Sequence, residues 1–141
     1  MLKAVKVLNR ISVILFVIVL LTSYAYMPIS VHMSIEEIGD LHKQTFFYYA
    51  VGSFLVINIL VKIILHFGIK KLEEDLQAWI TSLIFIFNIY QIFIIIYLAV
   101  WNNQGHIDPA YFSAFTLIGP VLLVVWIFGI FFIKNKSPRT T

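Results

Sequence analysis

The sequence predicts an all-α integral membrane protein, a bundle of four transmembrane helices. Its 141 residues are 61% hydrophobic and 12% charged, whereas soluble domains are about 45–50% apolar and about 25% charged. Four apolar runs reach the roughly 20 residues that a helix needs to cross the hydrocarbon core of a bilayer. The basic residues also gather on one side of these runs, as is typical of multi-pass membrane proteins.

The four runs leave little chain for a soluble domain, so residues 1–141 are predicted to form a single membrane domain. Transmembrane β-strands alternate polar and apolar residues, and these continuously apolar runs favour helices instead. We expect the first run to be retained as a span, because it is longer than the apolar part of a signal peptide. The predicted spans are residues 8–27, 46–65, 79–100 and 110–133.

The charged residues predict that both termini and the central loop face the cytoplasm. Nine of the ten Lys and Arg residues flank these segments, and only Lys43 lies on the opposite side. With three acidic residues the inner side carries a net charge of +6, and with four the outer side carries −3. The basic balance therefore reflects topology and does not indicate a nucleic-acid partner. The predicted outer loops are 28–45 and 101–109, the cytoplasmic loop is 66–78 and the C-terminal tail is 134–141.

The first outer loop fits two local structures. From Ile29 to Glu36 apolar and polar residues alternate, which is typical of a β-strand. Ser34 and Glu37 have the spacing of a helix capping box, which instead predicts one helical turn ending near Gly39. We favour the strand, and the two structures are compatible in sequence.

Polar residues recur at helical spacing within the second and third runs, and we call them the polar seam. Asn58, Lys62 and His66 share one face of the second span, and a matching stripe follows the third span. The seam is either a solute or ion pathway or a set of hydrogen bonds between helices, and we favour hydrogen bonds. Lys62 is expected to reach the head groups with its long side chain. The candidate residues are Asn58, Lys62, Thr81, Asn88 and Gln91, with Gln77 at the end of the stripe.

Gly119 and Pro120 lie in the middle of the fourth predicted span. Proline removes a backbone hydrogen bond inside a helix, so the sequence predicts a kink there. Kinks of this kind are common in membrane helices and do not by themselves indicate gating.

No catalytic or cofactor motif is present, and we expect a protein that is not an enzyme. The outer-loop candidates for ligand binding are His32, His42, His106 and Asp108. Imidazole and carboxylate groups suit zinc, but these spacings match no known ligand motif. We therefore predict neither a metal nor a cofactor.

Two resemblances are carried by short elements. Tyr24-Ala25-Tyr26-Met27-Pro28, followed by Phe46-Phe47-Tyr48, resembles small uncharacterised bacterial four-span membrane proteins with a Y-A-Y-x-P element after the first helix. This resemblance implies the four-span architecture and no activity. More distantly, the order Pro28, His32, Gly39 and Lys43 resembles the outer loop of toxin-immunity membrane proteins. The spacings differ, and Met27 stands where that group has Leu, so the immunity function does not transfer.

The leading functional hypothesis is a non-catalytic accessory or scaffolding subunit in a bacterial inner membrane. Its expected partners are the lipid bilayer and either helices of other membrane subunits or further copies of the same chain. One alternative is a small-solute or ion transporter or channel that uses the polar seam. Another is a sensor or immunity-type protein that acts through the first outer loop.

Overall fold

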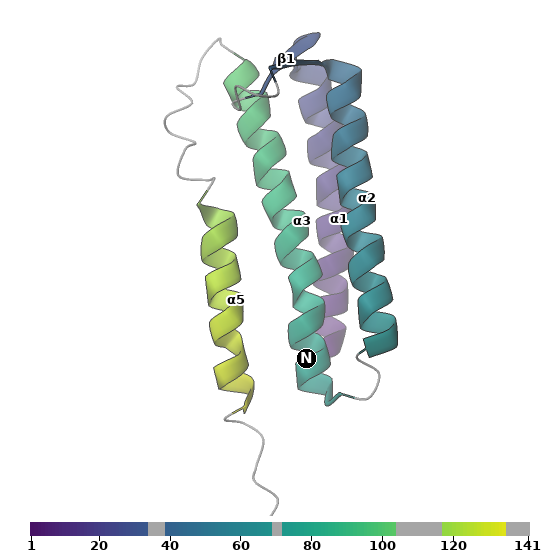
Figure 1. Cartoon of the computed structure of the whole chain (residues 1–141), viewed down its shortest axis with the longest axis vertical. Coiled ribbons are helices and arrows are strands. Elements are labelled where there is room, and N and C mark those ends of the chain that lie inside the picture. The colour runs from purple at the N-terminus through teal and green to yellow at the C-terminus, as the bar shows by residue number, and fades with distance from the viewer. Residues whose placement is uncertain (34–38, 69–71, 104–116, 135–141) are drawn as a thin grey trace, which may run out of the picture.

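In a computed structural model of the chain, the described residues form four helices and one short β-hairpin (Figure 1). The structure describes residues 1–33, 39–68, 72–103 and 117–134. The elements in chain order are α1 (Leu2–Tyr26), β1 (Ser30–His32), β2 (Asp40–His42), α2 (Lys43–Gly68), α3 (Glu74–Asn102) and α5 (Ile118–Lys134). The described chain is therefore all-α apart from the hairpin, as the sequence predicts.

Three of the helices are long and apolar enough to cross a membrane. The most apolar segments of α1, α2 and α3 have mean hydropathies of 2.3, 2.1 and 2.4. The 17 residues of α5 cover about 25 Å, less than the hydrocarbon core of about 30 Å. The chain is thus a multi-pass helical membrane protein by length and composition. The first part of the fourth predicted span, residues 110–116, lies outside the described residues.

The helices extend beyond the predicted spans, and the span boundaries themselves stay predictions. Helix α1 begins at Leu2 instead of residue 8. The predicted loop 66–78 is shorter, because α2 continues to Gly68 and α3 begins at Glu74. Intrahelical backbone hydrogen bonds do not depend on hydropathy, so a helix continues past its apolar part into the head-group region. Residues 101 and 102 likewise belong to α3 and residue 134 to α5, whereas 104–109 and 135–141 lie outside the described residues.

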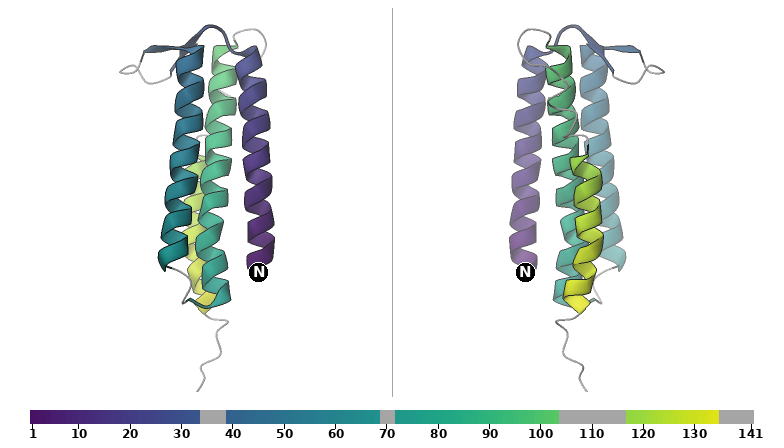
Figure 2. Two further views of the ribbon diagram at one scale, coloured as in Figure 1. Left: turned by 90° about the vertical axis from the view of Figure 1, so that its right-hand side faces the viewer. Right: turned by 90° about the vertical axis from the view of Figure 1, so that its left-hand side faces the viewer.

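Helix α3 is the centre of the arrangement. It packs along most of α1 and also contacts α2, β1 and α5. Among the described residues α5 contacts α3 alone, and it lies beside α3 outside the group formed by α1, α2 and α3 (Figures 1 and 2). The four helices therefore form a three-helix bundle with one attached helix, and not a closed four-helix bundle in which every helix has two neighbours.

The core of the three-helix bundle lies in its half nearer the hairpin. The rings of Phe16 and Phe54 stack there, with centroids 3.7 Å apart and planes 11° apart. Val31 of the hairpin is fully buried in the same cluster. The hairpin therefore covers this end of the bundle and places the Val31 side chain in the core. The other buried members are Leu20, Met27, Phe46, Ile92, Ile95 and Leu98.

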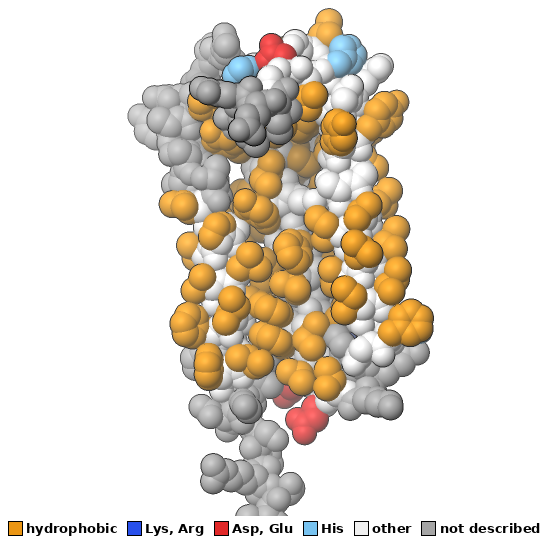
Figure 3. Space-filling view, in the orientation of Figure 1, with side chains coloured by type: hydrophobic (Ala, Val, Ile, Leu, Met, Phe, Trp, Pro, Cys, Tyr) orange, Lys and Arg blue, Asp and Glu red, His pale blue; other side chains and the backbone are white. Residues whose placement is uncertain are grey.

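The outer surface of the helices is apolar over nearly their whole length. In Figure 3 hydrophobic side chains are spread along the visible faces of the helices, whereas acidic side chains lie at both ends and histidines at the end that carries the hairpin. Phe67 of α2 and Phe131 of α5 are 82% and 60% exposed. Soluble monomers rarely expose so large an apolar area, and a bilayer removes this cost by covering it with lipid.

Helix α5 is held on α3 by aromatic rings that pack against glycines. The ring of Tyr90 lies so close to Gly119 that a Cβ there would meet it at 2.2 Å. Nearer the end of α5, the Trp79 ring packs against Gly129. It also stacks on the Trp126 ring, with centroids 4.0 Å apart and planes 5° apart. Small residues commonly permit such close approach between membrane helices.

Pro120 does not interrupt the described part of α5. The helix begins at Ile118, so Pro120 lies in its first turn, where a proline N–H is not needed for an intrahelical bond. The predicted kink concerns the junction with residues 110–116, which lie outside the described residues, so it stays a prediction.

We predict that Gly119→Ala weakens the attachment of α5 to α3. The added Cβ cannot fit beside the Tyr90 ring, so the cost should be that of overpacking, about 1–3 kcal/mol. Thermal unfolding of the purified protein in detergent measures this change. Gly52→Ala in α2 is the matched control, because a Cβ there meets nothing within 4 Å. Equal stability of the two variants would contradict the close contact.

Candidate functional site

A cluster of three polar side chains joins α1, α2 and α3 inside the bundle. Asn58 Nδ2 donates to Asn88 Oδ1 at 2.8 Å, and Asn88 Nδ2 donates to Ser12 Oγ at 2.9 Å. Asn88 Nδ2 also lies 3.4 Å from Asn58 Oδ1, so the two amides bond reciprocally. The structure therefore brings together two of the predicted seam residues, Asn58 and Asn88.

The cluster is closed upon itself and upon the nearby backbone. Asn88 and Ser12 are fully buried, and Asn58 is 6% exposed. Asn58 also donates to the Phe54 carbonyl at 2.9 Å, and Ser12 donates to the Asn9 carbonyl at 2.9 Å. Because these groups satisfy one another, they act as contacts between helices and expose no continuous polar surface to a passing solute.

The remaining seam residues lie away from this cluster. The Thr81 carbonyl accepts a hydrogen bond from Asn9 Nδ2 at 3.1 Å, and its hydroxyl donates within α3 to Gln77. Gln91 lies on the side toward the hairpin, where its Nε2 donates to Ser53 Oγ at 3.3 Å. Lys62 is exposed near the end of α2. The seam is thus divided between two cavities. Asn58, Lys62 and Thr81 line one of them, together with Gln77, and Gln91 lines the other.

Sequence reasoning missed the polar residues of α1. Asn9 and Ser12 are one helical turn apart and share a face, which is the same signal that identified the stripes on the other spans. The signal is weaker in α1 because the pair is not followed by a further polar residue until Thr22. Ser53 was also missed, since its spacing to Asn58 does not continue the stripe.

A cavity opens between α1, α2 and α3 at the end of the bundle where α1 begins, and we call it the basic cavity. Its volume is about 540 Å³. It reaches from basic residues near the helix ends to Asn58 of the buried cluster. Its walls are formed by Leu2, Lys6, Asn9, Arg10, Val13, Asn58, Lys62, Leu65, His66, Gln77, Thr81 and Ile84.

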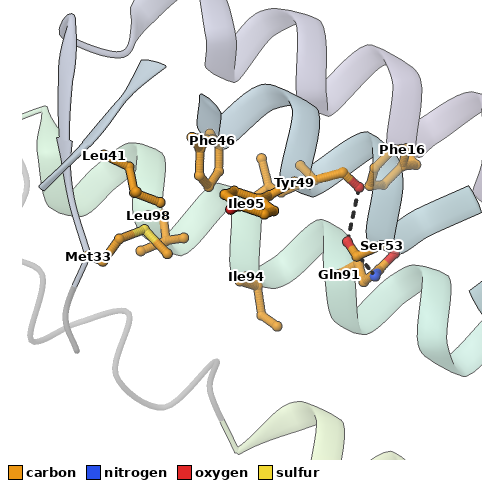
Figure 4. Close-up of a pocket in the computed structure, with 11 residues that line it drawn as sticks. Phe16, Met33, Leu41, Phe46, Tyr49, Ser53, Gln91, Ile94, Ile95 and Leu98 are labelled. Atoms are coloured by element: carbon orange, nitrogen blue, oxygen red, sulfur yellow. Dashed lines mark hydrogen bonds between the residues drawn. The ribbon is translucent and has the colours of Figure 1, made fainter. Parts of the chain in front are cut away.

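A second cavity of about 500 Å³ lies between α2 and α3 below the hairpin (Figure 4). Met33 and Leu41 cover it from the hairpin, and Tyr49 and Ile94 form its sides. Its polar lining is the Ser53–Gln91 pair, which is drawn with dashed lines in Figure 4. Gln91 Oε1 is buried without a hydrogen-bond partner among the described residues. The cavity is otherwise apolar, so a polar solute would find little to bind there.

The loop between α1 and α2, which the sequence predicts to lie outside, forms a β-hairpin. This confirms the predicted strand and adds a second strand that the sequence did not predict. Val31 pairs with Leu41, and His32 pairs with Asp40. Gly39 has a φ of +64°, a left-handed conformation that suits glycine where the chain turns back. Residues 34–38, where the alternative helical turn was predicted, lie outside the described residues.

The hairpin is fixed to α3 through the Asn102 side chain. Its Oδ1 accepts from the His32 backbone N–H at 2.6 Å, and its Nδ2 donates to the His32 carbonyl at 3.0 Å. The side-chain amide thus bonds to both backbone groups of His32, as the backbone of a neighbouring β-strand would. Asn102 is thus the residue that carries β1 on the end of α3.

The predicted outer-loop ligands do not meet in one described site. His32 Nδ1 and Asp40 Oδ1 form a hydrogen bond at 2.5 Å, with both side chains more than half exposed. The ring of His42 accepts from the Gln44 backbone N–H. Among the residues that the structure describes, no three His, Asp or Glu side chains are placed to hold a metal ion. His106 and Asp108 lie outside the described residues.

Comparisons with known proteins found no matching family model, no matching curated protein and no matching solved structure.

We predict that Asn88→Leu destabilises the bundle by about 1–2 kcal/mol. The change removes hydrogen bonds to Ser12 and Asn58, and interhelical bonds in membrane proteins are each worth about 0.6 kcal/mol, at most about 1.7. Reversible unfolding in mixed micelles measures the change. Gln44→Leu, at an exposed position of α2, is the control and should have little effect. A double-mutant cycle with Asn58→Leu should show coupling between the two amides, and additive effects would exclude it.

We predict that Asn102→Ala releases the hairpin from α3. The His32 backbone groups then lose their partners, so the amides of β1 and β2 should exchange with solvent faster. Hydrogen exchange followed by mass spectrometry measures this in detergent. Asn103→Ala is the control, because this exposed neighbour makes no bond to the hairpin. Unchanged exchange in Asn102→Ala would show that Val31 alone holds the hairpin.

Proposed function

We propose that this protein is a non-catalytic accessory or scaffolding subunit that packs against helices of another membrane protein. The observation that carries the proposal is the position of α5. It contacts α3 alone among the described residues, and Val121, Val125 and Phe128 on its surface are 57–62% exposed. A helix with one neighbour has a free side on which a partner helix can pack.

The interior of the bundle favours this role over transport or catalysis. Ser12, Asn58 and Asn88 are buried and satisfy one another. The cavity beneath the hairpin is lined by apolar side chains apart from one polar pair. Transport through the polar seam would require these contacts to break. A sensor function would require the hairpin to bind a ligand, but the polar groups of the described hairpin are largely bonded to one another.

The proposed orientation places the hairpin outside and the basic cavity inside a bacterial inner membrane. The start of α1, the end of α2 and the start of α3 lie at one end of the bundle (Figure 1), and most Lys and Arg residues belong to that end. The hairpin lies at the opposite end. At that end Lys43, the first residue of α2, donates from Nζ to the Met27 carbonyl at 2.9 Å, and its Nζ lies 4.5 Å from the Tyr24 ring centroid. The two resemblances drawn from the sequence remain predictions and support the architecture alone.

Photocrosslinking from α5 in living cells tests the proposal. A photoreactive amino acid at Val125 should give one discrete adduct with another membrane protein. The same residue at Ile64 of α2, which is 63% exposed, is the matched lipid-facing control and should give none. Crosslinking to lipid alone from both positions would contradict the accessory role. An adduct between two copies of this chain would show that α5 packs against a second copy and not against another membrane protein, which would contradict the proposed partner.

A further inference from the structure

The basic cavity concentrates positive charge from two neighbouring helices. Lys6 and Arg10 are four residues apart on α1, Lys62 lies on α2, and all three side chains line the cavity. Like charges four residues apart repel within a helix. Here the pair on α1 also shares a space with the Lys62 ammonium of the neighbouring helix, so the arrangement favours an anion between them.

Among the described residues, no acidic side chain lines this cavity. Glu73, Glu74 and Asp75 lie at the start of α3, at the same end as the cavity, but outside its lining. Within the described part of the chain, no carboxylate forms an ion pair with Lys6, Arg10 or Lys62. These three charges can therefore accept an anion from the surroundings.

The cavity changes character with depth. Lys6 and Arg10 lie toward the start of α1, and Val13 of α1 and Ile84 of α3 form apolar walls deeper in the bundle, beside Asn58. Seven residues separate Lys6 from Val13, which corresponds to about 10 Å along α1. A ligand that fills the space thus needs an anionic group at one end and apolar carbon at the other.

We propose that the basic cavity binds an anionic phospholipid, with its phosphate between Arg10 and Lys62 and the start of an acyl chain along Val13 and Ile84. The planar guanidinium of Arg10 suits two phosphate oxygens, and the Lys62 ammonium supplies a point charge from the facing helix. Basic pockets between membrane helices bind anionic head groups in this way. A soluble phosphate ester shares the charge but cannot use the apolar wall.

Lipid titration of the purified full-length protein in a non-ionic detergent tests the proposal. Phosphatidylglycerol is compared with phosphatidylcholine of the same acyl chains and with glycerol phosphate, and melting temperature and native mass spectrometry are the readouts. We expect saturable stabilisation and a retained lipid adduct with phosphatidylglycerol alone. Lys62→Gln should weaken the apparent affinity about fivefold, and Arg10→Gln combined with Lys62→Gln about thirtyfold.

Two matched variants separate a defined site from general attraction to charge. Lys3→Gln removes one positive charge from α1 outside the cavity lining and should leave the affinity unchanged. Lys62→Arg should retain it. Equal stabilisation by phosphatidylcholine, or equal losses in Lys3→Gln and Lys62→Gln, would overturn the site. Equal stabilisation by glycerol phosphate would overturn the assignment to a lipid.

Discussion

The structure depends on the rule that polar groups inside a bilayer must find partners within the protein. Lipid supplies no hydrophobic force to bring helices together, so packing and hydrogen bonds determine how they associate. The Asn88 side chain meets both requirements, because it bonds to Ser12 of α1 and Asn58 of α2 at one depth. The stacked rings of Phe16 and Phe54 lie one turn away on the same helices. The cluster thus fixes the register of three helices, and the apolar core toward the hairpin follows from that register.

The sequence was informative where a single segment carries the signal. The continuous apolar runs predict the first three spans, and the spacing of Asn58 and Asn88 predicts polar faces that the structure brings together. Signals that depend on tertiary contact were not visible. The three residues of β2 are too short for a pattern, and the role of Asn102 requires that β1 lies on the end of α3. Helix ends could not be read from the apolar runs, because hydropathy marks the lipid boundary and not the end of the helix.

The two ends of the bundle treat charge differently. At the hairpin end the described charges are matched nearby, as His32 meets Asp40 and Lys43 meets a carbonyl and an aromatic face. At the opposite end Lys6, Arg10 and Lys62 surround a space without an acidic neighbour in its lining. At the hairpin end the described polar side chains find partners within the protein, whereas at the opposite end the basic side chains are available to a ligand.

The attachment of α5 has a spectroscopic consequence. The chain has three tryptophans, and two of them, Trp79 and Trp126, stack on one another while each indole N–H donates to the backbone carbonyl of the other residue at 2.8–2.9 Å. Indole rings held this close couple electronically and produce an exciton signal in circular dichroism. The presence of that signal depends on α5 lying on α3. The protein thus contains an intrinsic optical reporter of whether its outermost helix is docked, readable without any added label.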